Sequence, residues 1–343
     1  AIPSSIPADL MEAILNLQKE ILADEKVCKR LQQRMDRKIA SGYNLFAFLR
    51  QIPANELLAQ LLVGSVGTLG IILSATLYAE KALHGEATLL LAFKSLRHAG
   101  EAVLALRDLD VAAIEIMNAQ SVKVVCERRK TAPDVLAMDG HVLLVEFSGD
   151  QAMDNLEKAE KLVASSSWDM SAPPKRATNA DEQKSLWATR KALLPTFMHY
   201  GPNLKAISVV NDVGLPPEHL AEFITDVENI FEDMGLVGAI YGHAGNGNLH
   251  LRPLFDLTSP QLHEQIRQLT QRVYGALFKY DGTITAEHGM GRLRAPFLAA
   301  EWGLEVFGYM MKIKQIFDEA DLLNPEVMFS ERDILSDLAP SLR

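Results

Sequence analysis

The densest group of polar side chains in this 343-residue sequence is the segment YGHAGNGNLH at 241–250. Two glycines and two asparagines separate His243 from His250. Side chains seven positions apart on one extended strand point to opposite faces, so the two imidazoles converge only if the chain bends between them. Gly245-Asn246-Gly247 has the composition of such a bend. Two convergent imidazoles are typical of a metal site.

A third metal ligand is available in the segment DGTITAEHGMG at 281–291, which carries Glu287 and His288. We expect a short strand that ends in this glycine-flanked pair and presents both side chains at its end. Taken singly, His243 and His250 are better explained as satisfied core or surface histidines, and Glu287 as a surface charge. The glycine turns around both segments favour the metal site.

Three further features are weaker signals. Glycines at 64, 67 and 70 would let the backbone approach a ligand closely, but the same spacing serves tight packing. It does not fit the dinucleotide fingerprint, because the third glycine comes too early and leads into an expected strand. Arg190 lies on a predicted helix and Lys205 begins the next strand, so from the residues alone each is a solvated charge.

The elements that must position these residues are strand–helix units that repeat from about residue 87. The patterns predict strands over 71–73, 87–93, 111–116, 141–147, 204–210 and 236–242, and helices over 7–38, 94–107, 150–165, 181–198, 216–234, 259–280 and 301–319. The Ser- and Pro-rich stretch 165–179 is expected to be a loop. This order predicts an α+β fold in which helices cover one face of an antiparallel sheet.

Composition narrows the functional classes. A net charge of −10 argues against a nucleic-acid-binding protein, which needs clustered Lys and Arg. Two cysteines form no disulfide framework and the N-terminus lacks a signal-peptide pattern, so we expect a cytoplasmic protein. Residues 57–79 are uncharged and long enough for a bilayer, but their glycines and the missing aromatic belt favour burial inside a cofactor domain.

Three segments resemble the C-terminal half of the FAD-linked oxidases, a family that includes D-lactate dehydrogenases, glycolate oxidase subunits and D-2-hydroxyglutarate dehydrogenases. They are GHAGNGNLHLRP (242–253), GTITAEHGMGRLRAPFLAAEWG (282–303) and FDEADLLNPEVMF (317–329). SGYNL (41–45) and GSVGTLGIILSATL (64–77) resemble the last strands of the family's FAD-binding domain. We therefore expect residues 1–85 to contain an N-terminal helix, which has no counterpart in the family, and the C-terminal remnant of that FAD-binding domain. The resemblance implies that a ferredoxin-like cap domain, which binds substrate and metal and ends in helices, follows at 86–343.

The resemblance also implies roles for the residues singled out above. His243, His250 and Glu287 would bind a divalent metal such as zinc, which would hold a 2-hydroxy acid by its carboxylate and hydroxyl oxygens. His288 would accept the hydroxyl proton while a hydride passes to FAD. Residues implied to contact the substrate are Arg190, Lys205 and Asn248, and those implied to contact the cofactor are Gly64, Ser65, Gly67, Thr68, Gly70, Ile71 and Asn324.

The sequence departs from the family at three places. Val66 stands where the family usually has Glu, and Leu194 replaces a hydroxyl residue of hydroxyglutarate-type enzymes. The segments that hold the FAD pyrophosphate belong to a region before SGYNL that the printed sequence does not contain. The form of 207–220 and the Arg252-Pro253 pair resemble members that work with iron–sulfur modules, so we expect an iron–sulfur or other electron-acceptor partner, with any membrane attachment made through it. A homodimer is compatible with the sequence.

Two alternatives stay open. A flavin-independent zinc hydrolase would use the same three ligands, with His288 as its acid–base group, but would leave the 64–70 glycines and the Leu-Asn-Pro segment without a role. A non-catalytic fragment or interaction subunit would bind neither FAD nor metal.

Overall fold

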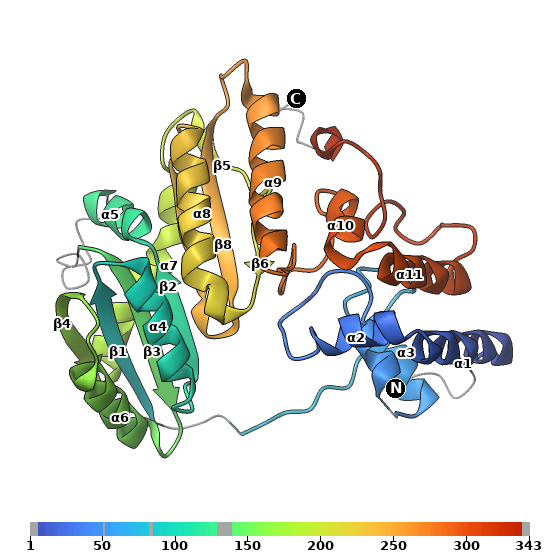
Figure 1. Ribbon diagram of the computed structural model, residues 1–343, viewed down its shortest axis with the longest axis horizontal. Coiled ribbons are helices and arrows are strands. Elements are labelled where there is room, and N and C mark those ends of the chain that lie inside the picture. The colour runs from blue at the N-terminus through green and yellow to red at the C-terminus, as the bar shows by residue number, and fades with distance from the viewer. Residues whose placement is uncertain (1–5, 51, 82–84, 129–138, 338–343) are drawn as a thin grey trace. The chain divides into compact units, whose positions relative to one another are not determined.

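The computed structural model describes residues 6–50, 52–81, 85–128 and 139–337 (Figure 1). The chain forms two compact units, one of Ala1–Glu80 with Thr283–Arg343 and one of Lys81–Gly282. We call them the terminal unit and the sheet unit. The change of unit near residue 80 lies close to the boundary at 85 that the resemblance implied, whereas the stretch after residue 282 groups with the terminal unit.

The sheet unit is built on one eight-stranded antiparallel sheet. Its strands are β1 (Glu86–Phe93), β2 (Ala113–Met117), β3 (His141–Ser148), β4 (Met170–Ala177), β5 (Leu204–Ala206), β6 (Val213–Gly214), β7 (Gly238–His243) and β8 (Asn248–Asp256). They lie in the order β4-β1-β3-β2-β7-β8-β5, and β6 also pairs with β8. The predicted α+β class with an antiparallel sheet is confirmed.

Helices cover both faces of this sheet, and the expectation of one covered face is wrong in that detail. The helices are α4 (Leu96–Arg107), α5 (Ala119–Arg128), α6 (Ala152–Ser165), α7 (Ala180–Met198), α8 (Leu220–Asp233) and α9 (Leu262–Lys279). Successive residues of β1, Leu89 to Leu91, are all fully buried, so both faces of the strand are covered. Helices α5 and α7 contact one face, which we call the α7 face, while α4 and α6 contact β1 and β3 on the other (Figure 1).

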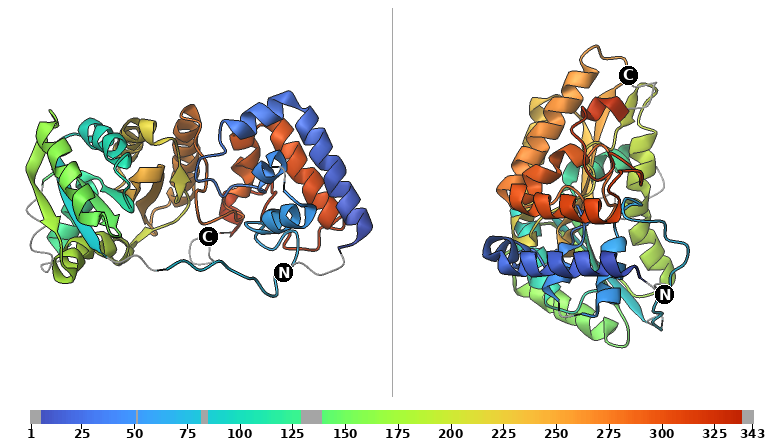
Figure 2. Two further views of the ribbon diagram at one scale, coloured as in Figure 1. Left: turned by 90° about the horizontal axis from the view of Figure 1, so that it is seen from below. Right: turned by 90° about the vertical axis from the view of Figure 1, so that its right-hand side faces the viewer.

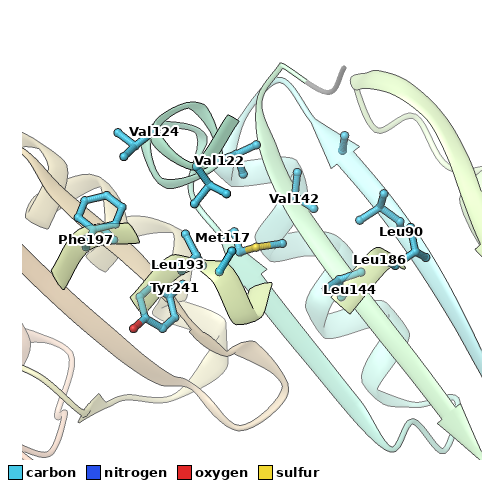
Figure 3. Packing of buried hydrophobic residues seen from close by; sticks show 14 of the residues in the cluster. Leu90, Met117, Val122, Val124, Val142, Leu144, Leu186, Leu193, Phe197 and Tyr241 are labelled. Atoms are coloured by element: carbon cyan, nitrogen blue, oxygen red, sulfur yellow. The ribbon is translucent and has the colours of Figure 1, made fainter. Parts of the chain in front are cut away.

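The core of the α7 face joins helices α5 and α7 to residues of β1, β2, β3, β4, β7 and β8 (Figure 3). Leu186, Leu193 and Phe197 come from α7 and pack with Leu144 of β3 and Tyr241 of β7. This packing holds the middle and end of α7 and the end of β7 in fixed positions, which places the polar residues next to them.

Two segments of the sheet unit differ from the predicted elements. The stretch 165–179, expected to be a loop, contains β4. Pro173 and Pro174 are compatible with a strand there because β4 lies at the edge of the sheet and pairs only with β1. Helix α5 begins beside His141, whose Nδ1 accepts a hydrogen bond from the Ala119 amide at 3.2 Å, and the sequence patterns did not predict it.

The terminal unit is helical. Its helices are α1 (Ala8–Ala23), α2 (Glu25–Gln32), α3 (Ala54–Leu62), α10 (Leu298–Trp302) and α11 (Leu304–Phe317), and α1 packs against α11 (Figure 2). The predicted single helix over 7–38 is wrong because Asp24 interrupts it. Asp24 has an extended backbone, and its side chain caps α2 by accepting from the Val27 amide at 3.1 Å.

A buried ion pair forms the centre of the terminal unit. The Arg34 guanidinium donates to a carboxylate oxygen of Glu301 at 3.0 Å, and both side chains are fully buried. The Ser41 hydroxyl at 2.6 Å and the Ile284 amide at 2.9 Å donate to the same carboxylate, and Arg34 stacks on the Trp302 ring. The pair therefore ties the turn after α2 to α10 and to the segment that precedes Glu287.

The predicted buried strand at 71–73 is wrong. Ile71, Ile72 and Leu73 lie in an extended segment outside any described helix or strand, and Leu73 is 92% exposed. Burial in this uncharged stretch ends at Leu69: Leu57, Leu58 and Leu61 of α3 are covered, and so are Ser65, Thr68 and Leu69 in the loop that follows. Among the described residues, no helix is both long and apolar enough to cross a membrane.

Candidate functional site

The β7–β8 hairpin brings the two predicted metal-binding histidines together. His243 pairs with Asn248 and Tyr241 pairs with His250 across the hairpin, so all four side chains lie on the α7 face. The connection needs Gly247, which has a φ of +74° and lies so close to Leu215 that a Cβ atom would stand 1.8 Å from the Leu215 carbonyl oxygen. The predicted bend is therefore present.

The geometry of the two imidazoles suits a shared metal ion. Their ring centres are 5.4 Å apart and the rings are almost perpendicular. Two imidazoles bound to one tetrahedral ion at about 2.1 Å have ring centres roughly 5 Å apart. His250 is buried, and Asp212, a buried carboxylate that sequence reasoning missed, offers an oxygen within 4.8 Å of a His250 ring nitrogen. His250 and Asp212 thus offer an imidazole nitrogen and a carboxylate oxygen, two donor types that a divalent ion such as zinc accepts.

Glu115 is a second residue that sequence reasoning missed. It lies on β2 opposite His243, its side chain is 4% exposed, and it contacts both His243 and Arg190. Arg190 donates from Nε to Glu115 Oε2 at 2.6 Å, and His243 Nδ1 bonds to Glu115 Oε1. Burial by itself raises the pKa of Glu115, but the hydrogen bond from His243 and the charge of Arg190 outweigh it and hold this pKa below its ordinary value. A signal was present, because one charged residue interrupts the apolar run around 113–117.

Arg190 therefore lies beside the histidines. Its guanidinium stacks on the Tyr241 ring at 4.5 Å, and the Tyr241 ring in turn lies 5.5 Å from that of His250. Asn248 is fully buried and its amide donates to Asp212 Oδ1 at 3.0 Å and to the Val213 carbonyl at 3.1 Å. The Asn248 amide group thus fixes Asp212 in place.

Lys205 is not brought to this cluster. It pairs with Phe255 on β8, and side chains alternate along a strand, so the register places Lys205 on the face opposite to His250. Leu194, one turn after Arg190 on α7, is 39% exposed.

Glu287 and His288 belong to the terminal unit, where they lie in a loop and not at the end of the expected strand. The loop is fixed upstream by a hydrogen bond from the Ala40 amide to the Thr285 carbonyl at 3.0 Å. Glu287 Oε2 bonds to Lys38 Nζ at 2.5 Å, and its other oxygen lies 3.4 Å from His288 Nε2. Both side chains are partly exposed and accessible.

The predicted cofactor-binding residues of the terminal unit are brought together in two neighbouring loops. Asn324 donates from Nδ2 to the Val66 carbonyl at 2.7 Å, which joins the Leu-Asn-Pro loop to the glycine loop at 64–70. Val66 and Asn324 both have positive φ, a costly conformation for a β-branched residue such as Val66 and one that is concentrated at functional sites. Gly64 has open space where a Cβ would be, whereas Ile71 is exposed beyond the loop.

Lys314 fixes the two loops to each other. Its buried ammonium donates to the Thr68 carbonyl at 3.1 Å and the Leu323 carbonyl at 2.9 Å, and pairs with Asp318 at 2.6 Å. The Thr68 and Ser65 hydroxyls bond to backbone within the same turn, so they build the loop. A pocket of about 340 Å³ lies beside these residues and is lined in part by Thr68, Lys314 and Asn324.

Comparison with known proteins decides the family. Residues 84–328, most of the chain, match the family described as FAD linked oxidases, C-terminal domain. The chain belongs to this family. The family resemblance of the three motifs is thereby confirmed.

This FAD-linked oxidase domain is similar to several curated 2-hydroxy-acid enzymes. It is 26% identical to the mitochondrial D-lactate dehydrogenase (cytochrome) of Arabidopsis thaliana over 84% of this chain and 48% of that protein. It is also 26% identical to a glycolate oxidase subunit of Bacillus subtilis, over 80% of this chain and 57% of that protein. A shorter match, 34% identical, covers 41% of this chain and 14% of the D-2-hydroxyglutarate dehydrogenase of Escherichia coli. The chain thus spans about half the length of the first two relatives.

Solved structures support the fold. A 4-ethylphenol oxidase from Gulosibacter chungangensis in an isoeugenol complex matches with a TM-score of 0.53 at 16% identity, over 72% of this chain and 54% of that one. An alkyldihydroxyacetonephosphate synthase matches with a TM-score of 0.51 at 16% identity, over 80% and 49% of the two chains. At these identities the likeness shows the fold alone.

Proposed function

We propose that this chain is the substrate- and metal-binding part of an FAD-dependent dehydrogenase that oxidises a D-2-hydroxy acid such as lactate, glycolate or 2-hydroxyglutarate. The observation that carries the proposal is the juxtaposition of His243 and His250, at the spacing of two ligands of one ion, with the cation Arg190. A 2-hydroxy acid has the matching chemistry, because its hydroxyl and one carboxylate oxygen can chelate an ion while a cation binds the carboxylate.

The residues of this chain would divide the work as follows. His243 and His250 hold the ion, and Arg190 binds a substrate carboxylate from the adjacent side. Glu287 as third ligand, His288 as the base that accepts the hydroxyl proton, and Asn248 as a substrate contact are proposed from the sequence motifs. A bound divalent ion lowers the pKa of the substrate hydroxyl, and bound FAD accepts the hydride from the α-carbon.

The terminal unit would contribute cofactor contacts. The glycine loop and the Leu-Asn-Pro loop meet at Val66 and Asn324, in a strained arrangement that Lys314 fixes from behind. A glycine loop with open space at Gly64 allows a flat ring system to approach the backbone. We propose that these loops contact the flavin when FAD is bound.

The experiment is flavin bleaching in the full-length gene product that contains this sequence, loaded with FAD and zinc. A D-2-hydroxy acid should reduce the flavin, seen as loss of its visible absorption. Replacing His250 by Ala should slow the reduction by at least 100-fold, while the matched variant His199→Ala, at an exposed position of the same unit, should react like the parent. Equal bleaching rates for His250→Ala and the parent would refute the metal assignment.

The zinc hydrolase is the second candidate, and the donor set itself favours testing it. A reporter ester or amide should be hydrolysed by the zinc-loaded protein without FAD if that alternative holds. Hydrolysis that His250→Ala abolishes, together with unchanged flavin absorption on adding 2-hydroxy acids, would replace the dehydrogenase proposal.

We also propose that the electrons leave the flavin for a separate acceptor protein, iron–sulfur or other, in the cytoplasm or at the inner face of the membrane. The support is the resemblance of the 207–220 segment and the absence of cysteines beyond Cys28 and Cys126, which are too few to ligate a cluster. Purification of the native complex should yield such a partner. Recovery of the protein alone, or as a homodimer that reacts directly with oxygen at full rate, would count against it.

A further inference from the structure

Glu115 occupies an unusual position for a carboxylate. It lies on β2 between Ile114 and Ile116, which are buried on the other face, and its own side chain is 4% exposed on the α7 face. A charge in such surroundings is costly unless both oxygens have partners. Both do, since Oε1 bonds to His243 Nδ1 and Oε2 accepts from Arg190 Nε at 2.6 Å.

The bond to His243 determines which imidazole nitrogen carries the proton. The Arg190 guanidinium forms an ion pair with Glu115 at 2.6 Å, and an ionised carboxylate has oxygens that only accept hydrogen bonds. The hydrogen in the Glu115–His243 bond must then belong to Nδ1 of the imidazole. A neutral imidazole with hydrogen on Nδ1 carries its lone pair on Nε2, which is the form that binds a metal.

The bond to Arg190 fixes the plane of the guanidinium. Nε is held by Glu115 while the same group stacks on the Tyr241 ring at 4.5 Å, so one hydrogen bond and one stacking contact restrict it from two directions. Because Nε is engaged by Glu115, substrate contacts fall to the terminal nitrogens of the guanidinium.

We propose that Glu115 is the positioning residue of this site, setting the tautomer of His243 for metal binding and the orientation of Arg190 for a substrate carboxylate. The proposal rests on the proposed function for the identity of the ligands. One buried carboxylate would thus orient both groups that bind the substrate, the metal ligand His243 and the cation Arg190.

Glu115→Gln tests the proposal because glutamine has nearly the same shape but one acceptor and one donor end. The charged Arg190 donor will retain the amide oxygen, so the amide NH₂ faces His243 Nδ1. That nitrogen must then accept, which moves the imidazole hydrogen to Nε2. We therefore expect Glu115→Gln to invert the His243 tautomer in the metal-free protein.

The measurement is long-range ¹H–¹⁵N NMR of the full chain labelled with ¹⁵N-histidine, with the His243 signals assigned by their loss in His243→Asn. Wild type should show Nδ1–H and Glu115→Gln should show Nε2–H. Zinc affinity, measured by competition with a chromophoric chelator, should fall by 10- to 100-fold in Glu115→Gln. Glu146→Gln is the matched control, because Glu146 lies on the same face of the neighbouring strand β3 and should leave the tautomer and the affinity unchanged.

The outcomes separate this proposal from the proposed function. Wild-type protein with Nε2–H on His243, or a Glu115→Gln variant that keeps Nδ1–H and binds zinc within threefold of wild type, overturns the role of Glu115. The His243 tautomer of the wild-type protein is measured without any variant, so the proposal can still be refuted if Glu115→Gln does not fold. Wild-type protein that binds no zinc refutes the metal in the proposed function, and inversion of the tautomer in Glu115→Gln then still supports the positioning role.

Discussion

Removal of the Arg34 guanidinium should destabilise the terminal unit in a pH-dependent manner. Arg34→Met keeps the length of the side chain and leaves Glu301 with hydrogen bonds from Ser41, Thr283 and the Ile284 amide, but without a counter-charge. Burial already raises the pKa of Glu301, against the lowering effect of Arg34. Without Arg34 this pKa should rise further, so that the folded variant takes up a proton at neutral pH.

The size of the effect follows from the cost of that proton. Glu301 is ionised in the unfolded chain, where its pKa is about 4.5, so neutralising it at pH 7 costs about 1.4 kcal/mol for each of the roughly 2.5 pH units, or about 3.5 kcal/mol. A buried charge left unpaired is expected to cost a similar 3–5 kcal/mol. Since the folded pKa is raised, the stability lost by the variant is greatest at pH 7 and should shrink as the pH falls toward about 4.5.

Urea unfolding followed by Trp302 fluorescence is the assay, because Arg34 stacks on this ring. The other two tryptophans, Trp168 and Trp187, lie in the sheet unit and are replaced by Phe in every variant compared. Arg34→Met/Glu301→Gln is the control, and it should recover much of the loss and remove its pH dependence. A loss below about 1 kcal/mol at pH 7 would mean that Glu301 carries no charge for Arg34 to compensate, and would refute the reasoning.

Three further predictions concern single residues. Burial lowers the pKa of His141 to about 4, so the free energy of unfolding of the sheet unit should fall by up to about 3 kcal/mol as the pH falls from 6.5 to 4. Urea titrations at stepped pH measure this dependence, and His141→Gln should remove it. Gly247→Ala places a Cβ against the Leu215 carbonyl and should lower stability by more than about 2 kcal/mol, seen as a reduced Tm, with normal stability refuting the close approach. Lys314→Met removes the cation that lowers the pKa of Asp318 to about 2 and that joins the glycine loop to the Leu-Asn-Pro loop. Limited proteolysis should therefore cut these loops faster in the variant than in wild type, and equal rates would contradict that role.

The strands of the sheet unit were predictable because their apolar runs are long and bounded by polar turns. The same runs also indicate how many faces of the sheet are covered by helices. Strand β1 has apolar residues at successive positions without alternation, which indicates two covered faces, yet one was expected. Strand β4 could not be found from composition, since its prolines are unfavourable in every position except at a sheet edge, and edge position is a property of the whole sheet.

The candidate site was predictable to the extent that it is local in sequence. The hairpin with His243 and His250 follows from glycine spacing over eight residues. The contacts of Glu115 with His243 and with Arg190 join positions 128 and 75 residues apart, and no spacing rule relates them. Lys205 was chosen from the family pattern, but the register of β5 on β8 places it on the opposite face of the sheet from His250. This register depends on strand pairing and cannot be read from local sequence.

The polar cluster on the α7 face is better explained by function than by stability. The neighbouring residues of this face, Met117 and Leu144, are apolar and fully buried, so an apolar side chain at position 115 would extend the hydrophobic core. A buried ion pair typically adds no stability over apolar residues of the same volume, and losing one partner leaves the other exposed to a penalty of several kcal/mol. Three mutually dependent polar side chains, Glu115, Arg190 and His243, are therefore a liability for folding alone. Their arrangement gains a purpose if the imidazole and the guanidinium must be held in one orientation each for a ligand that binds both.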